Sequence, residues 1–256
     1  MLDAIAAARR SKAPEDDYDL TKARDEGTLG EAPLPASVDL REPWHEVPQQ
    51  GHTASCVGWS LADSVLRWHL VKAGRLAPDA HLSARHIWMS AKETDERVEY
   101  PSTFLEEDGT SLKQGLEVIR KFGAVLDTEL PWEGGLAPGP PDAFNTSAAS
   151  RRIVAYFNLN DDDAKKRFSG WRRWLAEHGP VAVLIQMDAH IDDAQLAGAF
   201  DAGSVNGSHS AALFGYGPDH FLLRSSWGPE WGDGGYARMS LAYAEQAVIE
   251  SYGVIV

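Results

Sequence analysis

Residues 50–60 of the chain read QGHTASCVGWS and hold Cys56, the one cysteine among 256 residues. A lone thiol cannot form a disulfide within its own chain, so it is either an inert core residue or a reactive nucleophile. An apolar, helix-forming run follows Cys56 and ends at Gly74, with Thr53 or Ser55 as the expected cap. Because the N-terminus of a helix stabilises a thiolate, this position suits a nucleophile.

The composition indicates a folded, acidic protein. Apolar residues make up 43% of the chain, and 24 Lys and Arg against 38 Asp and Glu give a formal net charge of -14. No basic cluster interrupts the acidity, which argues against nucleic acid and anionic membranes as partners. The apolar stretch 181–185 is far shorter than the about 20 residues of a membrane span. The N-terminus lacks the charge order of a secretory signal, and with no internal disulfide we expect a cytoplasmic protein.

The predicted elements divide the chain into an extension, a helical half and a strand-rich half. Residues 1–34 are rich in charge, Ala and Gly, so we expect a flexible N-terminal extension. Residues 134–150 are rich in Gly and Pro and mark the crossing between the halves. Helices are expected from residue 83, over 111–122 and over 161–178, and strands over 153–159, 181–186, 210–216, 220–225 and 236–239.

His209 is the histidine best placed to act with the thiol. It opens a predicted strand after a glycine turn, whereas the other eight histidines lie in predicted helices or in loops without companion residues. An imidazolium beside a thiol stabilises the thiolate, although a histidine in a strand is also a common core residue. The aspartates at 161–163 fit a helix cap better than a calcium loop, and we expect no metal and no cofactor.

Three blocks in this order resemble the papain family of cysteine peptidases. Gln50 precedes Cys56 by six residues, as in the family's Gln-Gly…Ser-Cys loop. His209 leads a strand that ends in GYG, similar to the family's His-Ala…Gly-Tyr-Gly. Residues 226–236, SWGPEWGDGGY, resemble Ser-Trp-Gly-x-x-Trp-Gly-x-x-Gly-Tyr. Together with VDLR at 38–41, the resemblance covers residues 35–256 and is to bacterial-type members without disulfides.

The resemblance implies an α+β, papain-like two-lobe fold and a cysteine endopeptidase acting on a peptide or protein. A helical lobe would span about 35–145 and an antiparallel, β-barrel-like lobe about 146–256, with the active-site cleft between them. Cys56 would attack the peptide carbonyl as a thiolate, and His209 would pass the proton to the leaving amine. The Gln50 side chain and the Cys56 backbone N–H would form the oxyanion hole.

The resemblance also implies substrate-binding residues. Trp227 would shield the contact behind the histidine from water, and Trp231 would wall the cleft beside it. Gly109 and Ser208 would hold an extended peptide, although Gly109 also fits a helix-capping turn. The N-terminal segment is either a solvated tail or an element that covers the active site.

One departure from the family concerns the residue that orients the histidine. The family has an Asn before the Ser-Trp-Gly block, and this chain has Ser225. A hydroxyl is shorter than a carboxamide, so Ser225 would accept from the ring N–H directly or through a water. Three uses of the thiol therefore stay open: peptide hydrolysis, a pseudoenzyme that keeps the cleft as a peptide-binding module, and acyl transfer, as in a deamidase or ligase.

Overall fold

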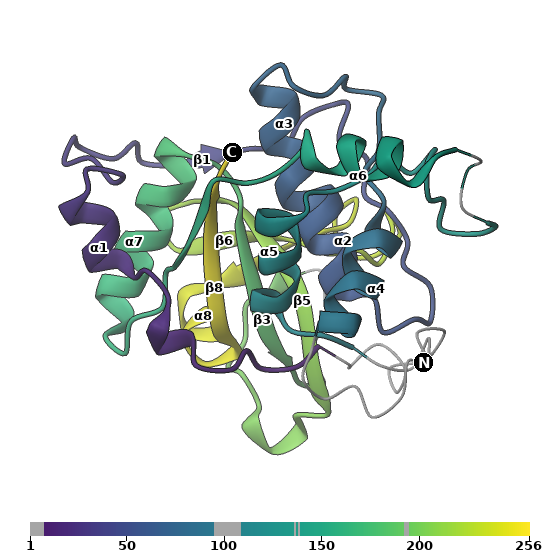
Figure 1. Cartoon of the computed structure of the whole chain (residues 1–256). Helices are drawn as coiled ribbons and strands as arrows, with labels where there is room; N and C mark the ends of the chain where they lie inside the picture. The colour runs from purple at the N-terminus through teal and green to yellow at the C-terminus, as the bar shows by residue number, and fades with distance from the viewer. Residues whose placement is uncertain (1–7, 95–108, 136, 138, 192–194) are drawn as a thin grey trace.

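In a computed structural model, which describes all residues except 1–7, 95–108, 136, 138 and 192–194, a sheet runs through the middle of the molecule (Figure 1). Helices cover both faces. On one side lie α2 (Cys56–Trp59), η2 (Ser60–Arg67, a π-helix), α3 (Trp68–Lys72), α4 (Ala84–Thr94), α5 (Leu112–Lys121) and α6 (Pro141–Ala149). On the other lie α1 (Leu20–Asp25), α7 (Ala164–Glu177) and α8 (Leu241–Ala247). No helix of the described residues is long and apolar enough to cross a membrane.

The sheet comprises eight strands in the described part of the chain, in the order β2-β8-β3-β5-β6-β7-β4, with β1 paired to β5. Neighbouring strands are antiparallel except β4 and β7, which are parallel. Their bounds are β1 (Val38–Asp39), β2 (Ala155–Asn158), β3 (Val181–Met187), β4 (Gln195–Leu196), β5 (Gly207–Tyr216), β6 (His220–Arg224), β7 (Tyr236–Ser240) and β8 (Val248–Ile255).

Strand β3 is buried on both faces and separates two hydrophobic cores. Val183 and Ile185 belong to the core that contains Trp171 of α7, whereas Leu184 belongs to the core that contains Cys56. A strand covered on both sides needs a continuous apolar run, which residues 181–185 supply. The two lobes therefore meet along β3 and the neighbouring β5.

Residues 8–33 run along the molecule and include α1; we call residues 8–10 the tip and residues 11–33 the strap. Leu20 and Leu29 of the strap join the core of α7. Gly170 of α7 makes room for Leu20, because a Cβ at residue 170 would lie only 2.7 Å from Leu20 Cδ1. The leucine side chains, and the close approach of Leu20 to Gly170, therefore pack the strap against the sheet lobe.

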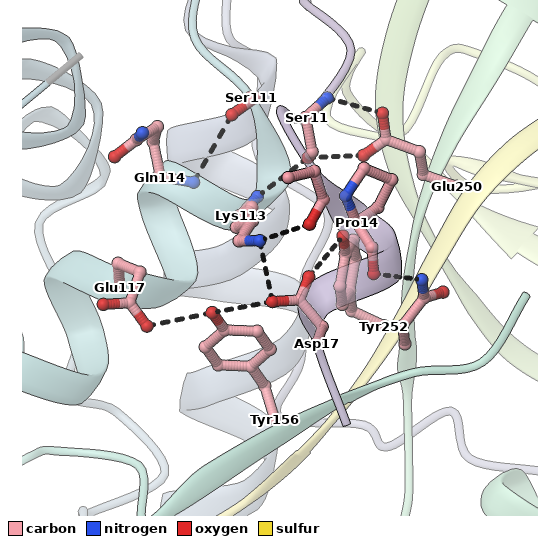
Figure 2. A network of polar contacts seen from close by, with 12 residues as sticks. Ser11, Pro14, Asp17, Ser111, Lys113, Gln114, Glu117, Tyr156, Glu250 and Tyr252 are labelled. Carbon is pink, nitrogen blue, oxygen red and sulfur yellow. Dashed lines mark hydrogen bonds and ion pairs between the residues drawn. The ribbon is translucent and has the colours of Figure 1, made fainter. Parts of the chain in front are cut away.

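Polar contacts fix the start of the strap between the two lobes (Figure 2). The backbone N–H and the hydroxyl of Ser11 each donate to the Glu250 carboxylate at 2.6 Å. The Asp17 carboxylate lies 2.8 Å from Lys113 Nζ and accepts from the Tyr252 hydroxyl at 3.1 Å. Lys113 belongs to α5 and Glu250 and Tyr252 to β8, so the strap bridges the lobes.

The structure confirms the α+β, two-lobe fold, and it differs from the sequence-based expectation in several of its elements. Residues 1–34 were expected to be flexible, but in the described part Leu20, Ala23 and Leu29 are buried. Residues 141–149 form α6, so the chain leaves the helical side after residue 149 rather than near residue 145. Residues 241–255 form α8 and β8, which were not predicted, and β8 lies inside the sheet.

Candidate active site

Cys56 is the first residue of α2 and is completely buried. Ser55 occupies the cap position, but its hydroxyl lies 2.6 Å from that of Thr53 and makes no cap hydrogen bond. Burial raises the pKa of the thiol, and backbone N–H groups, including those of Val57 and Cys56 in the first turn, act in the opposite direction. The helix start therefore favours a thiolate, and burial opposes it.

His209 lies in β5, where it pairs with Ile185 of β3, and is also completely buried. Its Nε2 lies 3.0 Å from the Ser225 hydroxyl, within direct hydrogen-bond distance. Its Nδ1 has no hydrogen-bond partner among the described residues. The Trp227 ring covers the imidazole, with centroids 4.1 Å apart. One ring nitrogen is thus held and shielded, and the other is available.

Ser225 follows Arg224, the last residue of β6, and a buried ion pair fixes this strand end. The Arg224 guanidinium lies 2.7 Å from the Asp63 carboxylate of η2, in the other lobe. Burial would raise the pKa of Asp63, but Arg224 and the other basic neighbours lower it overall, so the carboxylate is ionised. The pair ties the residue behind His209 to the helix that starts at Cys56.

Gln50 is buried and held at both ends of its amide. Its Nε2 donates to the Thr53 carbonyl at 2.8 Å, and its Oε1 accepts from the Ser226 hydroxyl at 2.6 Å. The Gln50 backbone N–H donates to the Ser226 carbonyl at 2.8 Å. One amide hydrogen is used by Thr53, so the second is the one that can serve a developing oxyanion.

The two tryptophans of the third block stack beside the histidine. Trp227 and Trp231 meet edge to face with centroids 5.2 Å apart. Trp231 Nε1 donates to the Ile191 carbonyl at 3.3 Å, which attaches the loop after β3 to the same wall. The aromatic wall therefore continues from the imidazole to Ile191, which follows β3.

The tip lies over the thiol and touches both lobes. The Ala8 N–H donates to the Ser208 carbonyl at 3.2 Å, and the same N–H group also lowers the pKa of the Cys56 thiol. The Arg9 N–H donates to the Thr110 carbonyl at 3.0 Å, next to Gly109, which is buried. Ser208 and residues 109–110 thus hold an extended backbone between them.

Burial under these contacts sets the charge of the reactive pair. It raises the pKa of Cys56 to about 11 and lowers the pKa of His209 to about 3. Both groups are therefore neutral near pH 7 in this state. Exposure to water would move the two pKa values toward each other and favour the thiolate and the imidazolium.

The structure links the residues singled out in the sequence by separate contacts. His209 contacts Ser225 and Trp227, Trp227 contacts Trp231, and Gln50 bonds to Ser226 beside Ser225. The N–H of Ser210, which follows His209, reaches the Cys56 thiol, and the tip joins Ser208 to Thr110 beside Gly109. Sequence reasoning missed Ser226, which holds the Gln50 amide although it stands in the quoted third block, and Ala8, which no local pattern distinguishes. Among the described residues no group of three His, Cys, Asp or Glu side chains is arranged to hold a metal ion. The site holds the Cys56 thiol at a helix start and the His209 imidazole beside Ser225.

Comparisons with known proteins agree with this chemistry. A family model described as papain family cysteine protease matches residues 34–256. Vignain of Phaseolus vulgaris is 28% identical over 218 residues, which are 80% of this chain and 54% of that protein. Cathepsin L of Sarcophaga peregrina is 28% identical over 221 residues, 81% of this chain and 59% of that protein. The chain spans roughly half the length of these curated relatives.

Solved structures share the fold. Xylellain, a cysteine protease from Xylella fastidiosa, superposes with a TM-score of 0.80 at 20% identity, covering 99% of this chain and 97% of its own. Digestive procathepsin L 3 of Tenebrio molitor larval midgut has a TM-score of 0.65 at 20% identity and covers 99% and 76%. At these identities the likeness concerns the fold.

Proposed function

Because the chain belongs to the papain family of cysteine proteases, we propose that it cleaves peptide bonds with Cys56 as nucleophile and His209 as proton carrier. Two observations support this best: Cys56 lies at a helix start within reach of the Ser210 N–H, and His209, the residue before Ser210, has its Nε2 held by Ser225 at 3.0 Å. The Cys56 thiolate attacks the carbonyl carbon and forms a thioester, and imidazolium His209 protonates the departing amine. Water then hydrolyses the thioester, with His209 as base.

Two donors serve the oxyanion of the tetrahedral intermediate. They are the Cys56 backbone N–H and the second amide hydrogen of Gln50, whose side chain is already oriented by Thr53 and Ser226. Each such donor is worth about 3 kcal/mol in the transition state. The hydrogen bonds that prepare Gln50 exist before any substrate arrives, so little reorganisation is needed.

Ser225 takes the place of the family's orienting Asn in this proposal. Its hydroxyl reaches the ring directly, so no bridging water is needed. Trp227 above the ring keeps water away from this contact. Ser225 follows Arg224 directly in the chain. The ion pair between Arg224 and Asp63 therefore fixes the backbone that carries the Ser225 hydroxyl.

Ser208 and Gly109 with its neighbour Thr110 are proposed to bind the substrate backbone, and the tip is proposed to cover this site. The support is that Ser208 and Thr110 carbonyls hold the N–H groups of Ala8 and Arg9. Structures described as procathepsins are among those with the same fold. A peptide substrate and the tip would therefore compete for the same carbonyl groups.

The experiment compares the full chain, a chain lacking residues 1–10, and each of these with Cys56→Ala. Digestion of unfolded casein, followed by mass spectrometry, reports hydrolysis, and a papain-directed epoxide reports the thiol. We expect hydrolysis and labelling in the chain without the tip and neither in the Cys56→Ala variants. A folded chain without the tip whose thiol resists the epoxide at neutral pH would refute the proposal.

A pseudoenzyme that binds peptides is the second candidate, and the neutral state of Cys56 and His209 favours it. Peptide binding of equal affinity in the Cys56→Ala variant, with no turnover by the unmodified chain, would support it. A burst of product at the start of the casein reaction would exclude it, since a burst requires an acyl-enzyme.

A further inference from the structure

The two reactive side chains come from different lobes, and their spacing depends on how α2 and β5 meet. These elements are in contact, and most of what lies between them is apolar: Val57, Leu61, Ala212 and Phe214 share one core. Apolar contacts are non-directional and set a distance only loosely. A directional contact next to the reactive residues would set it more closely.

Ser60 and Ser210 make such a contact. Ser60 lies one helical turn after Cys56, and Ser210 follows His209 directly. Their hydroxyl oxygens are 2.5 Å apart, and both side chains are buried. The Ser60 hydroxyl also donates to the Val57 carbonyl at 3.2 Å. The arrangement that satisfies both contacts has Ser60 donating to the Val57 carbonyl and Ser210 donating to Ser60.

Ser210 also reaches the thiol through its backbone, since its N–H group acts to lower the pKa of Cys56. Ser210 therefore contacts the Cys56 thiol through its N–H group and the helix of Cys56 through its hydroxyl. It is also the residue next to His209.

We infer that Ser60 and Ser210 are positioning residues that set the separation of Cys56 and His209. The inference rests on the proposed function, because it concerns the same thiol and imidazole. The thiolate and the imidazolium stabilise each other only at short range. A change in the hydroxyl pair should therefore alter the pH at which the ion pair forms.

The two serines are not equivalent, and this gives the inference a distinctive signature. Ser60→Ala leaves the Ser210 hydroxyl buried without an acceptor, which is the costly case. Ser210→Ala leaves the Ser60 hydroxyl bonded to Val57. The double variant leaves no orphan, so it should resemble Ser210→Ala.

The test measures the rate of Cys56 alkylation by iodoacetamide against pH in the full chain. Every variant keeps the same tip, so the effect of tip opening on the profile is common to all of them and does not affect their comparison. We expect Ser60→Ala to move the profile to higher pH and lower the rate at pH 7 about tenfold. Ser210→Ala should lower it about threefold, with the double variant close to Ser210→Ala.

Ser83→Ala is the matched control, because Ser83 is a buried serine of the helical lobe whose hydroxyl donates to the Leu130 carbonyl at 2.6 Å. It should lower the melting temperature and leave the profile in place. A Ser60→Ala profile that superimposes on that of the unmodified chain would overturn the inference. So would a loss by the same factor at every pH, or a double variant whose loss equals the product of the single losses.

The readout is reaction of the thiol and not hydrolysis of a peptide. A chain that labels as expected but cleaves nothing would refute the proposed peptidase and leave the positioning pair standing. If the unmodified chain cleaves casein and the Ser60→Ala profile does not move, the proposed peptidase stands and the positioning pair is refuted.

Discussion

The tip and the strap are consecutive segments, yet they are held by different means. Where the structure describes it, the tip is held by backbone hydrogen bonds from Ala8 and Arg9 to the carbonyls of Ser208 and Thr110, and it buries only the small Ala8 side chain against the core of Cys56. The strap buries Leu20 and is fixed by carboxylates at its start. A backbone hydrogen bond contributes about 1 kcal/mol net, whereas a buried leucine contributes about 2 to 3 kcal/mol. The tip can therefore open locally, while the strap is released only with the fold.

Deletion of residues 1–10 should have the largest effect and separates covering from anchoring. Water then reaches Cys56, and its pKa falls from about 11 toward an ordinary value near 9. The thiolate fraction at pH 7, and with it the alkylation rate, should rise about 100-fold. The rate in the full chain should keep rising up to about pH 11, whereas in the shortened chain it levels off at lower pH.

The control for this deletion carries Cys56→Ala as well and should not be labelled. Circular dichroism should show the fold of the full chain. Equal alkylation rates with and without residues 1–10 would mean that the tip does not protect the thiol.

Leu20→Ala tests how the strap is held and should leave Cys56 covered by the tip. It opens a cavity between α1 and Gly170 of α7, so the free energy of unfolding should fall by about 3 kcal/mol. Alkylation of the folded protein should stay slow. Val154→Ala is the control, because Val154 is 72% exposed and its loss should change stability by less than about 0.5 kcal/mol. Equal free energies of unfolding in urea for Leu20→Ala and Val154→Ala would contradict the prediction.

Asp17→Asn should lower the free energy of unfolding by less than Leu20→Ala does. It removes the charge that faces Lys113 at 2.8 Å and leaves the ammonium without its carboxylate. Because Lys113 keeps the Ala13 carbonyl and some access to water, we expect a loss of about 2 kcal/mol in urea unfolding. The neighbouring exposed Asp16, changed to Asn, should have no measurable effect. A loss that disappears in high salt would instead mark the contact as a surface pair.

Ser11→Ala should have the smallest effect and touches the boundary between the two segments. The hydroxyl bond to Glu250 is lost while the backbone N–H bond stays, so stability should fall by about 1 kcal/mol. Because the tip ends at the residue before Ser11, alkylation of Cys56 should also rise about threefold. Exposed Ser37→Ala should change neither quantity. An unchanged labelling rate would show that the hydrogen bond from the Ser11 hydroxyl to Glu250 does not influence the opening of the tip.

Residues that carry chemistry were easier to predict than residues that carry the fold. Cys56, Gln50 and His209, which we propose for the chemistry, stand in motifs whose spacing is local and whose order is specific. The elements of residues 56–72 and 181–186 also follow from local apolar patterns. Here local sequence and tertiary structure agree.

The rest depends on contacts between distant residues, which leave no local pattern. Leu20 stands among charged residues, and only its seat on Gly170 shows why it is buried. Strand β8 is a central strand although polar Glu250 and Ser251 interrupt it, since Ser11 and Trp171 hydrogen-bond to them. The Ser60–Ser210 contact joins residues 150 positions apart.

Ser225 has a consequence for the tautomer of His209. A hydroxyl either accepts a proton from Nε2 or donates its own to it. In the first case Nδ1 is a bare lone pair that can take the thiol proton; in the second Nδ1 carries the hydrogen and cannot. A carboxamide oxygen, which only accepts, would allow the first tautomer alone. With a serine behind the ring, the direction of one hydrogen atom decides in each molecule whether the imidazole is a base toward the sulfur.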